Sequence, residues 1–417
     1  MVGSSLSGYI HGLIIDKKRN TKWSKIALIS SFIISIGLLG FFKYSDFFIE
    51  NINNIFKSEI SLLRISLPIG ISFYTFQILS YNIDVYKNEA KVQKSFIKFA
   101  TYVALFPQLI AGPIVRYTTI EEQLTYRVTN IDNISSGMKR FIIGLGKKVL
   151  IANTLAEVSN IFLTSSEKSV LFYWIVAITF TLHIYFDFSG YSDMAIGLGK
   201  IFGFDFLENF NYPYISTSIT DFWRRWHISL STWFRDYVYI PLGGNRCSKL
   251  KWIRNVLVVW FLTGFWHGAE WNFIIWGLYF GIILLLEKLV FHKVLPKLPK
   301  FIKHIYTLFL VIIGFVIFNA TSLTDVLTSL EGMFGLLDIP LSNFETIYYL
   351  KSYLVVTLVA IVGATPLMKT LIIKIKNNQK GEKVLTVLEP IFCLILLLAV
   401  TASLVDGSFN PFLYFRF

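Results

Sequence analysis

Apolar residues in this chain are gathered into runs long enough to cross a lipid bilayer, and this feature constrains the fold most strongly. The first run, residues 26–42, contains 17 residues without a charge and follows a basic segment, residues 16–25. A hydrocarbon core about 30 Å thick is spanned by a helix of roughly 20 apolar residues. Because backbone polar groups must be satisfied inside the hydrocarbon, these runs predict helices. The expected fold class is therefore all-α, a polytopic helical membrane protein.

Eight further runs are candidate spans: residues 62–86, 96–115, 171–188, 252–266, 273–289, 305–318, 353–373 and 387–404. Pro68 interrupts the first of these and Pro107 the second, which indicates kinked or re-entrant pieces. Residues 138–162 predict either a basic amphipathic helix in the membrane interface or a tenth crossing. Among its apolar residues this segment carries four basic ones, Lys139, Arg140, Lys147 and Lys148.

The composition excludes an ordinary cytosolic enzyme. Of the 417 residues, 54% are apolar and only 16% are charged, whereas soluble domains carry about a quarter charged residues. The net charge of +13 comes from 39 basic and 26 acidic residues, an excess that marks loops kept in the cytoplasm. We expect membrane lipids around the chain and no nucleic-acid partner. Cys247 and Cys393 form neither a metal-type cluster nor a disulfide framework, so no metal site is expected.

Charged residues in the C-terminal half predict the sides of the membrane. Lysines between residues 293 and 303 and between 374 and 383 belong inside, and acidic residues between 325 and 345 outside. Counting backward, residues 209–251 form a cytoplasmic-side re-entrant or interfacial segment. The absence of a fixed-period repeat weakens solenoid and duplicated-transporter interpretations. A single membrane domain, residues 1–417, is expected.

His267 lies in LTGFWHGAEWNFIIWG, residues 262–277, the segment that we expect to form an active site. Gly264 and Gly268 lack side-chain bulk, so another helix or a substrate can approach Trp266 and His267 closely. A histidine there needs a stabilising partner or a function. The alternative is an aromatic belt at the membrane interface with histidine as a polar anchor.

His227 lies in the mixed aromatic and basic stretch FWRRWHISLSTWFRDYVYIPLGGNR, residues 222–246. This stretch is either a solvated basic loop with interfacial tryptophans or the wall of a cytoplasmic entrance. In the second interpretation three arginines bind the phosphates of an anionic donor: Arg224, Arg225 and Arg235. Of the other histidines, His183 has two interpretations. It is either a structural residue that is hydrogen-bonded to a neighbouring helix or part of an intramembrane relay.

Asp187 and Asp193 lie inside or beside an apolar helix, where charges are costly. They are expected to pair with arginines of the following loop, or else to polarise a catalytic histidine. The nearby glycines form no dinucleotide fingerprint, and the chain contains no G-x-S-x-G elbow, P-loop or H-E-x-x-H helix.

Four stretches, residues 106–116 (FPQLIAGPIVR), 183–214, 222–246 and 264–277, resemble the membrane-bound O-acyltransferase (MBOAT) family in the family's order. They resemble more narrowly its bacterial, AlgI-like branch of alginate O-acetyltransferases. The resemblance implies a ring of about nine to eleven transmembrane helices around a central tunnel. It also implies that the N-terminus lacks one or two helices that relatives usually have.

By this resemblance, His267 matches the family's essential histidine and His227 its second histidine, a donor-side or structural support. A neutral imidazole can accept the proton of a sugar hydroxyl as the hydroxyl attacks an acyl thioester. The donor implied is acetyl-CoA or another acyl thioester, with no permanently bound cofactor. The acceptor is an extracellular or cell-wall polysaccharide, reached through an outer-side acetyltransferase partner, and the location is the bacterial cytoplasmic membrane.

Two alternatives stay open at this point. The same fold can transfer D-alanine from a carrier protein to teichoic acid, because coenzyme A and a phosphopantetheine carrier are both anionic. A lipid-linked sugar transporter or flippase would also be polytopic and basic on the inside. Loss of acyl transfer on substitution of His267 separates the enzymes from the flippase.

Overall fold

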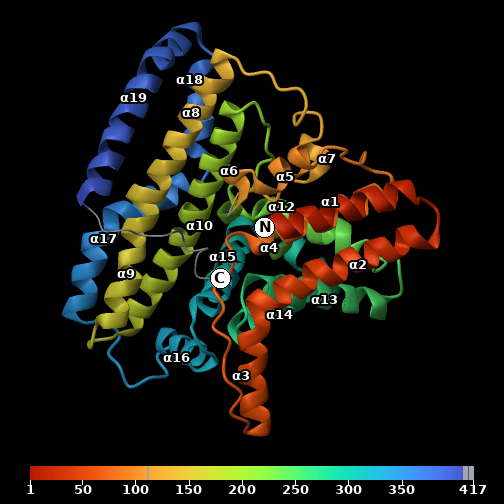
Figure 1. Ribbon diagram of the computed structural model, residues 1–417. Coiled ribbons are helices and arrows are strands. Elements are labelled where there is room, and N and C mark those ends of the chain that lie inside the picture. The colour runs from red at the N-terminus through yellow and green to blue at the C-terminus, as the bar shows by residue number, and fades with distance from the viewer. Residues whose placement is uncertain (110–111, 407–411, 413–417) are drawn as a thin grey trace. The chain divides into compact units, whose positions relative to one another are not determined.

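The computed structural model describes residues 1–109, 112–406 and 412, and every regular element within them is a helix (Figure 1). Ile110 and Ala111, which belong to the stretch FPQLIAGPIVR, lie outside the described residues. By their contacts the residues divide into two compact units, residues 1–138 with 195–207, and residues 139–194 with 208–417. The boundary passes through two helices, α8 (Ile131–Gly146) and α10 (Val170–Ile201).

The described part of the first unit contains seven complete α-helices. They are α1 (Val2–Lys17), α2 (Lys22–Leu39), α3 (Ser45–Phe56), α4 (Ile71–Lys87), α5 (Phe96–Ala104), α6 (Phe106–Leu109) and α7 (Tyr117–Ile120), and a π-helical turn, η1 (Gly40–Tyr44), joins α2 to α3. Helices α1, α2 and α4 pack against one another. Aromatic rings fill the core, with Tyr81 4.6 Å from Phe99 and Tyr102 5.4 Å from Tyr117 between ring centroids.

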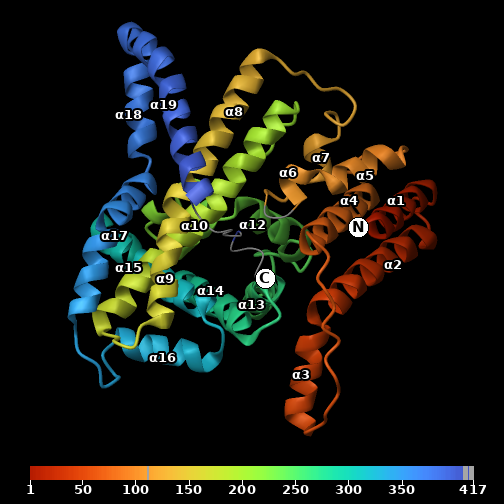
Figure 2. The ribbon, with the colours of Figure 1, turned by 60° about the vertical axis from the view of Figure 1, so that its left-hand side comes forward.

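The second unit contains the segments in which the candidate histidines lie. Its elements after α8 are η2 (Lys147–Ala152), α9 (Asn153–Thr164), α10, η3 (Pro213–Ile215), α11 (Ile219–Arg225), α12 (Ile228–Phe234), η4 (Arg235–Tyr239), α13 (Lys249–His267), α14 (Trp271–Leu289), η5 (Phe291–Lys293), η6 (Leu295–Lys297), α15 (Lys300–Asn319), α16 (Leu323–Met333), α17 (Phe344–Gly363), α18 (Leu367–Lys376) and α19 (Gln379–Asp406). Helices α18 and α19 lie side by side in both ribbon views (Figures 1 and 2).

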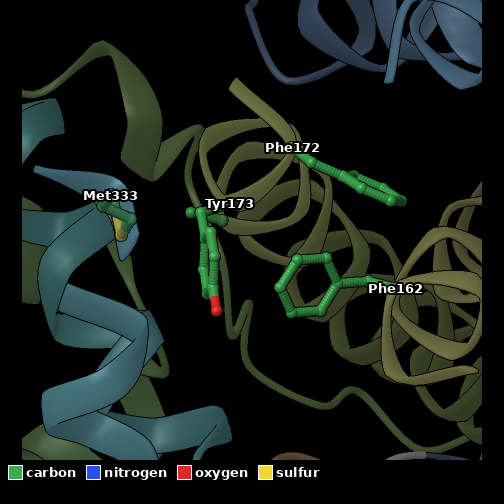
Figure 3. Close-up of a cluster of buried hydrophobic side chains, with 5 residues drawn as sticks. Phe162, Phe172, Tyr173 and Met333 are labelled. Carbon is green, nitrogen blue, oxygen red and sulfur yellow. The ribbon is translucent and has the colours of Figure 1, made fainter. Parts of the chain in front are cut away.

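A buried aromatic cluster joins three helices of this unit (Figure 3). Phe162 of α9 packs edge-on against Phe172 and Tyr173 of α10, with ring centroids 5.1 and 4.7 Å apart. Met333 at the end of α16 completes the cluster. Edge-to-face aromatic pairs stabilise beyond their buried area, so this cluster fixes α9 and α16 on α10.

Six helices of the described chain are long and apolar enough to cross a membrane: residues 22–56, 170–201, 271–289, 300–319, 344–363 and 379–406. Two sequence runs are broken as their prolines predicted. Helix α4 begins only at Ile71, after Gly70 with φ of 74°, and the 96–115 run divides at Leu105 between α5 and α6. The number of crossings and the central tunnel stay predictions.

The expected span at residues 252–266 is not among these six helices. It belongs to α13, whose 19 residues include Lys249, Lys251 and Arg254 in the first two turns. These cations lower the hydropathy of the whole helix, although its second half is apolar. Sequence inspection found the apolar half and underestimated how far the helix extends toward its basic start.

Candidate active site

His267 is the last residue of α13, at the turn that leads into α14. The two helices pack closely because each presents a glycine to the other. A Cβ atom on Gly264 would lie 2.2 Å from the Phe273 carbonyl oxygen, and one on Gly277 would lie 2.2 Å from that of Trp260. Only glycine allows such an approach. The prediction that Gly264 admits a neighbouring helix is thus confirmed, and that helix is α14.

Aromatic rings surround the His267 imidazole, which is 6% exposed. Its ring centroid lies 5.0 Å from that of Trp266, 5.1 Å from Trp276 and 5.4 Å from Phe318. All three contacts are edge-to-face. Trp276 comes from α14 and Phe318 from α15, so three helices hold the imidazole in one orientation.

His227 occupies the connection between α11 and α12, and its side chain is 1% exposed. The backbone there is left-handed, with φ of 43°, a conformation that costs free energy for a residue other than glycine. Phe188 packs edge-on against the imidazole at 4.6 Å, and Trp266 lies 6.2 Å away between centroids. Trp266 therefore contacts both histidines.

Asn209 determines which nitrogen of His227 carries the proton. Its Oδ1 accepts hydrogen bonds from the Ser229 backbone N–H at 3.2 Å and the Ser229 hydroxyl at 2.9 Å. The same oxygen lies 3.2 Å from His227 Nδ1. Because an amide oxygen only accepts, His227 donates from Nδ1, and Nε2 holds the lone pair of the neutral ring. Burial lowers the pKa of His227 to about 3, so the ring is neutral at physiological pH.

Both histidines line one cavity of about 270 Å³. Helices α11, α12, α13 and α14 and the η4 turn form its walls. The lining residues are Thr220, Trp223, Trp226, His227, Leu230, Ser231, Phe234, Arg235, Tyr239, Trp252, Val256, Val259, Trp260, Thr263, His267, Leu284 and Lys288. The cavity thus combines two imidazoles, an aromatic wall and two cations, a composition suited to an anionic ligand with an apolar reacting end.

A buried carboxylate of α14 fixes the start of α11. Glu287 accepts hydrogen bonds from the backbone N–H of Ile219 at 2.7 Å and from the N–H and hydroxyl of Thr220 at 3.0 and 2.8 Å. These are charge-assisted bonds at a helix N-terminus, where a negative charge is favoured. Sequence analysis missed Glu287, although a lone acidic residue near the end of an apolar run was the available signal.

The three predicted arginines have different positions. Arg235 lines the cavity and bonds Asp236, with Nε 2.6 Å from Oδ1. Arg225 bonds Asp221 at 3.0 Å and the Asn211 carbonyl at 3.3 Å, and it does not line the cavity. Arg224 is exposed and also lies outside the cavity lining. The structure therefore brings only Arg235 to the two histidines.

The two aspartates pair with basic residues that precede them in the chain, which corrects the expectation of partners from the following loop. Asp187 bonds Lys148 at 2.5 Å, with both side chains at most 5% exposed. Asp193 bonds Arg140 at 2.8 Å and Lys147 at 2.7 Å. All three cations lie on the α8–η2–α9 run, and these pairs hold that run against α10. Neither aspartate lines the histidine cavity.

A second and larger cavity of about 1160 Å³ lies elsewhere in the same unit. His183 and Lys148 line it together with side chains rich in hydroxyl, amide and carboxylate groups. These polar residues are Asn153, Thr154, Glu157, Ser159, Asn160, Asn319, Thr321, Asp325, Ser329, Ser403 and Asp406. Asn319 directly follows Phe318, whose ring contacts His267. His267 therefore contacts the residue that precedes Asn319, a lining residue of this second cavity, in the chain.

Residues 85–329 match the family model described as MBOAT, membrane-bound O-acyltransferase family. The chain belongs to this family. It is thus an O-acyltransferase by class and a multi-pass membrane protein, as the four stretches predicted. The described residues contain no group of three or more His, Cys, Asp or Glu side chains placed to bind a metal ion.

Named relatives agree with this membership. A protein of Azotobacter vinelandii with the name probable alginate O-acetylase AlgI is 39% identical over 92% of this chain and 83% of its own length. The protein of the same name from Pseudomonas aeruginosa is 46% identical over 74% of this chain, and the match spans 60% of that protein. A peptidoglycan O-acetyltransferase of Helicobacter pylori is 38% identical over 83% of this chain and 71% of its own length.

Proposed function

We propose that the chain transfers an acetyl group from a cytoplasmic acyl thioester, acetyl-CoA, to a hydroxyl group for O-acetylation of an extracellular or cell-wall polysaccharide. The observation that carries this proposal is the shared cavity, which contains His267 and His227 together with the cations Arg235 and Lys288. Cations of this kind bind the phosphates of coenzyme A. The aromatic wall suits the uncharged thioester end of the donor.

His267 acts as the general base in this reaction. Its neutral imidazole accepts the hydroxyl proton while the hydroxyl oxygen forms a bond to the acyl carbon. The carbon–sulfur bond then breaks, and the thiolate of coenzyme A takes the proton from the imidazolium. His227 supports the donor side, since its Nε2 lone pair and neutral ring are fixed by Asn209.

The lining of the cavity favours an acetyl group over D-alanine. A D-alanyl thioester carries an ammonium group, which needs an acidic partner when it is removed from water. Among the described residues that line the cavity, none is aspartate or glutamate, and two are permanently or normally cationic. An uncharged acyl group avoids the repulsion from Arg235 and Lys288. The three relatives above are named as O-acetylases or as an O-acetyltransferase, which agrees with this choice.

The acceptor hydroxyl approaches from the opposite side. The second cavity contains Asp325 and Thr321, which lie in the part of the chain predicted to be outside. Its hydroxyl, amide and carboxylate groups match the hydrogen-bonding groups of a sugar. Phe318 contacts the His267 ring and directly precedes Asn319, which lines this cavity. In this proposal, the donor and the acceptor therefore approach His267 from different cavities. The protein acts in the cytoplasmic membrane of a bacterium, with an outer-side acetyltransferase as its partner.

The test is transfer of label from radioactive acetyl-CoA to extracellular polysaccharide in membranes that contain the chain, with its His267→Ala variant as the control. We expect transfer by the chain and its loss in the variant. Transfer that survives in His267→Ala removes this residue from the mechanism. Label from D-alanine but not from acetyl-CoA establishes the D-alanyl alternative, and transport of a lipid-linked sugar without any acyl transfer establishes the flippase.

A further inference from the structure

Trp223 of α11 lines the histidine cavity, and its indole N–H makes no hydrogen bond to the described part of the protein. Its Nε1 atom is buried and has no hydrogen-bond acceptor among the residues that the structure describes. A buried donor without an acceptor costs free energy and is rare in folded proteins. An unused donor on a side chain that lines a cavity points to an acceptor supplied by a ligand.

The other small polar groups of the cavity have acceptors within the protein. The Thr220 hydroxyl donates to Glu287, the Ser231 hydroxyl to the Trp223 carbonyl, and the Thr263 hydroxyl to the Val259 carbonyl. The indole N–H of Trp252 donates to the Tyr239 hydroxyl at 3.1 Å. The neighbouring Trp276 also has a buried Nε1 without an acceptor among the described residues, but only Trp223 of these two lines the cavity.

The Trp223 ring is held rigidly, as a preorganised donor must be. Its centroid lies 4.7 Å from that of Trp260, 4.9 Å from Phe280 and 5.5 Å from Trp276, all in edge-to-face contacts. Trp276 in turn contacts the His267 imidazole at 5.1 Å. Glu287 fixes the start of the short helix that carries Trp223. The donor and the general base therefore share one aromatic framework.

We propose that the indole N–H of Trp223 donates a hydrogen bond to the carbonyl oxygen of the acyl thioester and stabilises the oxyanion that forms there. This inference rests on the proposed function, because it requires a thioester donor in the cavity. As the hydroxyl oxygen bonds to the acyl carbon, the carbonyl electron pair moves onto oxygen, and His267 takes the hydroxyl proton. Collapse of the oxyanion expels the thiolate, which receives that proton. The N–H is not consumed in the step.

The test compares the wild-type chain with Trp223→Phe, which keeps an aromatic ring and lacks the donor. We expect kcat for acetyl transfer from acetyl-CoA to fall about 100-fold, the size typical of losing one oxyanion donor. The inhibition constant of S-ethyl-coenzyme A, a thioether without a carbonyl, should stay unchanged. Trp260→Phe is the matched control, because it removes the same ring bulk from the same cavity; its kcat should fall far less.

The possible results separate this inference from the function on which it rests. A Trp223→Phe variant with wild-type kcat overturns the donor role and leaves the acetyltransferase intact, while a wild-type chain without acetyl transfer overturns both. Equal losses of kcat and of S-ethyl-coenzyme A binding reduce Trp223 to a packing residue and also overturn the role. If Trp223→Phe does not fold, benzothienylalanine at this position keeps the bicyclic shape and replaces N–H by sulfur, and the same kcat criterion applies.

Discussion

Two oppositely charged residues of this chain pair with each other where the surroundings exclude water. Asp187 and Lys148 form an ion pair with side chains 2% and 5% exposed. Bringing two charges out of water is expensive, and their attraction compensates only while both are present. The pair is therefore a strong constraint on how α10 lies against the α8–η2–α9 run.

Neutralising one partner of this ion pair should destabilise the protein more than replacing both partners by apolar residues. Asp187→Asn leaves the Lys148 ammonium without this carboxylate, at a cost of about 3–5 kcal/mol. Asp187→Leu combined with Lys148→Met replaces both charges by apolar groups of similar size and should recover most of the loss. Thermal unfolding of the purified protein in detergent measures both. A double variant less stable than Asp187→Asn would contradict the prediction.

The buried state of His227 predicts how stability depends on pH. Its folded pKa of about 3 lies below the value of about 6.5 for an unfolded chain. As the pH falls below 6.5, His227 becomes protonated in the unfolded chain but stays neutral in the folded chain, so the free energy of unfolding decreases. His227 is expected to lower the free energy of unfolding by about 2 kcal/mol at pH 5 relative to neutral pH.

The matched control for this pH effect is His227→Asn, because asparagine tolerates the left-handed backbone at this position. Unfolding temperatures measured at pH 7.5 and pH 5 should differ more for the wild-type chain than for the variant. An equal drop in both proteins would assign the pH dependence to other groups.

Sequence motifs identified His267 and His227, yet they could not reveal the partners of the buried charges. A lone aspartate in an apolar run indicates a pair without saying which helix supplies the cation. The partners of Asp187 and Asp193 lie 39 to 53 residues away, on a segment whose own position was in doubt. Asn209 was missed because its contacts with His227 and Ser229 depend on how the chain folds back, which the sequence does not show. Glu287 was missed because two of its three donors are backbone N–H groups, although its position in an apolar run was a signal.

At the scale of elements, the α13–α14 hairpin carries the active-site geometry. The turn places His267 against Trp276 of the returning helix, and the glycines let the two helices approach to backbone contact. The glycine positions made this close approach predictable. The length of α13 was not, because hydropathy favours the apolar half and ignores the basic turns that extend the same helix.

Gly264→Ala should therefore separate the hairpin and abolish activity. The added methyl would lie 2.2 Å from the Phe273 carbonyl oxygen, a backbone atom that cannot move away without shifting α14. We expect a lower unfolding temperature together with loss of acetyl transfer. Gly37→Ala in α2 is the control, since no atom lies within 4 Å of its added methyl and alanine favours a helix over glycine. Wild-type activity in Gly264→Ala would show that the hairpin does not need this contact.

For the whole molecule, the order of spans and charged loops predicts which parts face each side of the membrane. From the inner lysines at residues 293–303, α15 leads outward to Asp325, α17 returns to the lysines at 374–383, and α19 crosses again. The helices themselves were predictable from apolar runs. Which end of each helix faces the cytoplasm is predicted from the charges of the loops alone.

The chain's two cysteines allow this arrangement to be tested directly. Both are free thiols; Cys247 lies in the predicted cytoplasmic segment and Cys393 within the α19 span. A membrane-impermeant maleimide should leave Cys247 unlabelled in intact cells and label it in inside-out vesicles. A Cys247→Ser chain that also carries Asp325→Cys should give the reverse result, because residue 325 is predicted to lie outside. The Cys247→Ser variant alone measures the background labelling of Cys393. Labelling of Cys247 from outside would invert the sides, and the donor could then not reach Arg235 and the histidines from the cytoplasm.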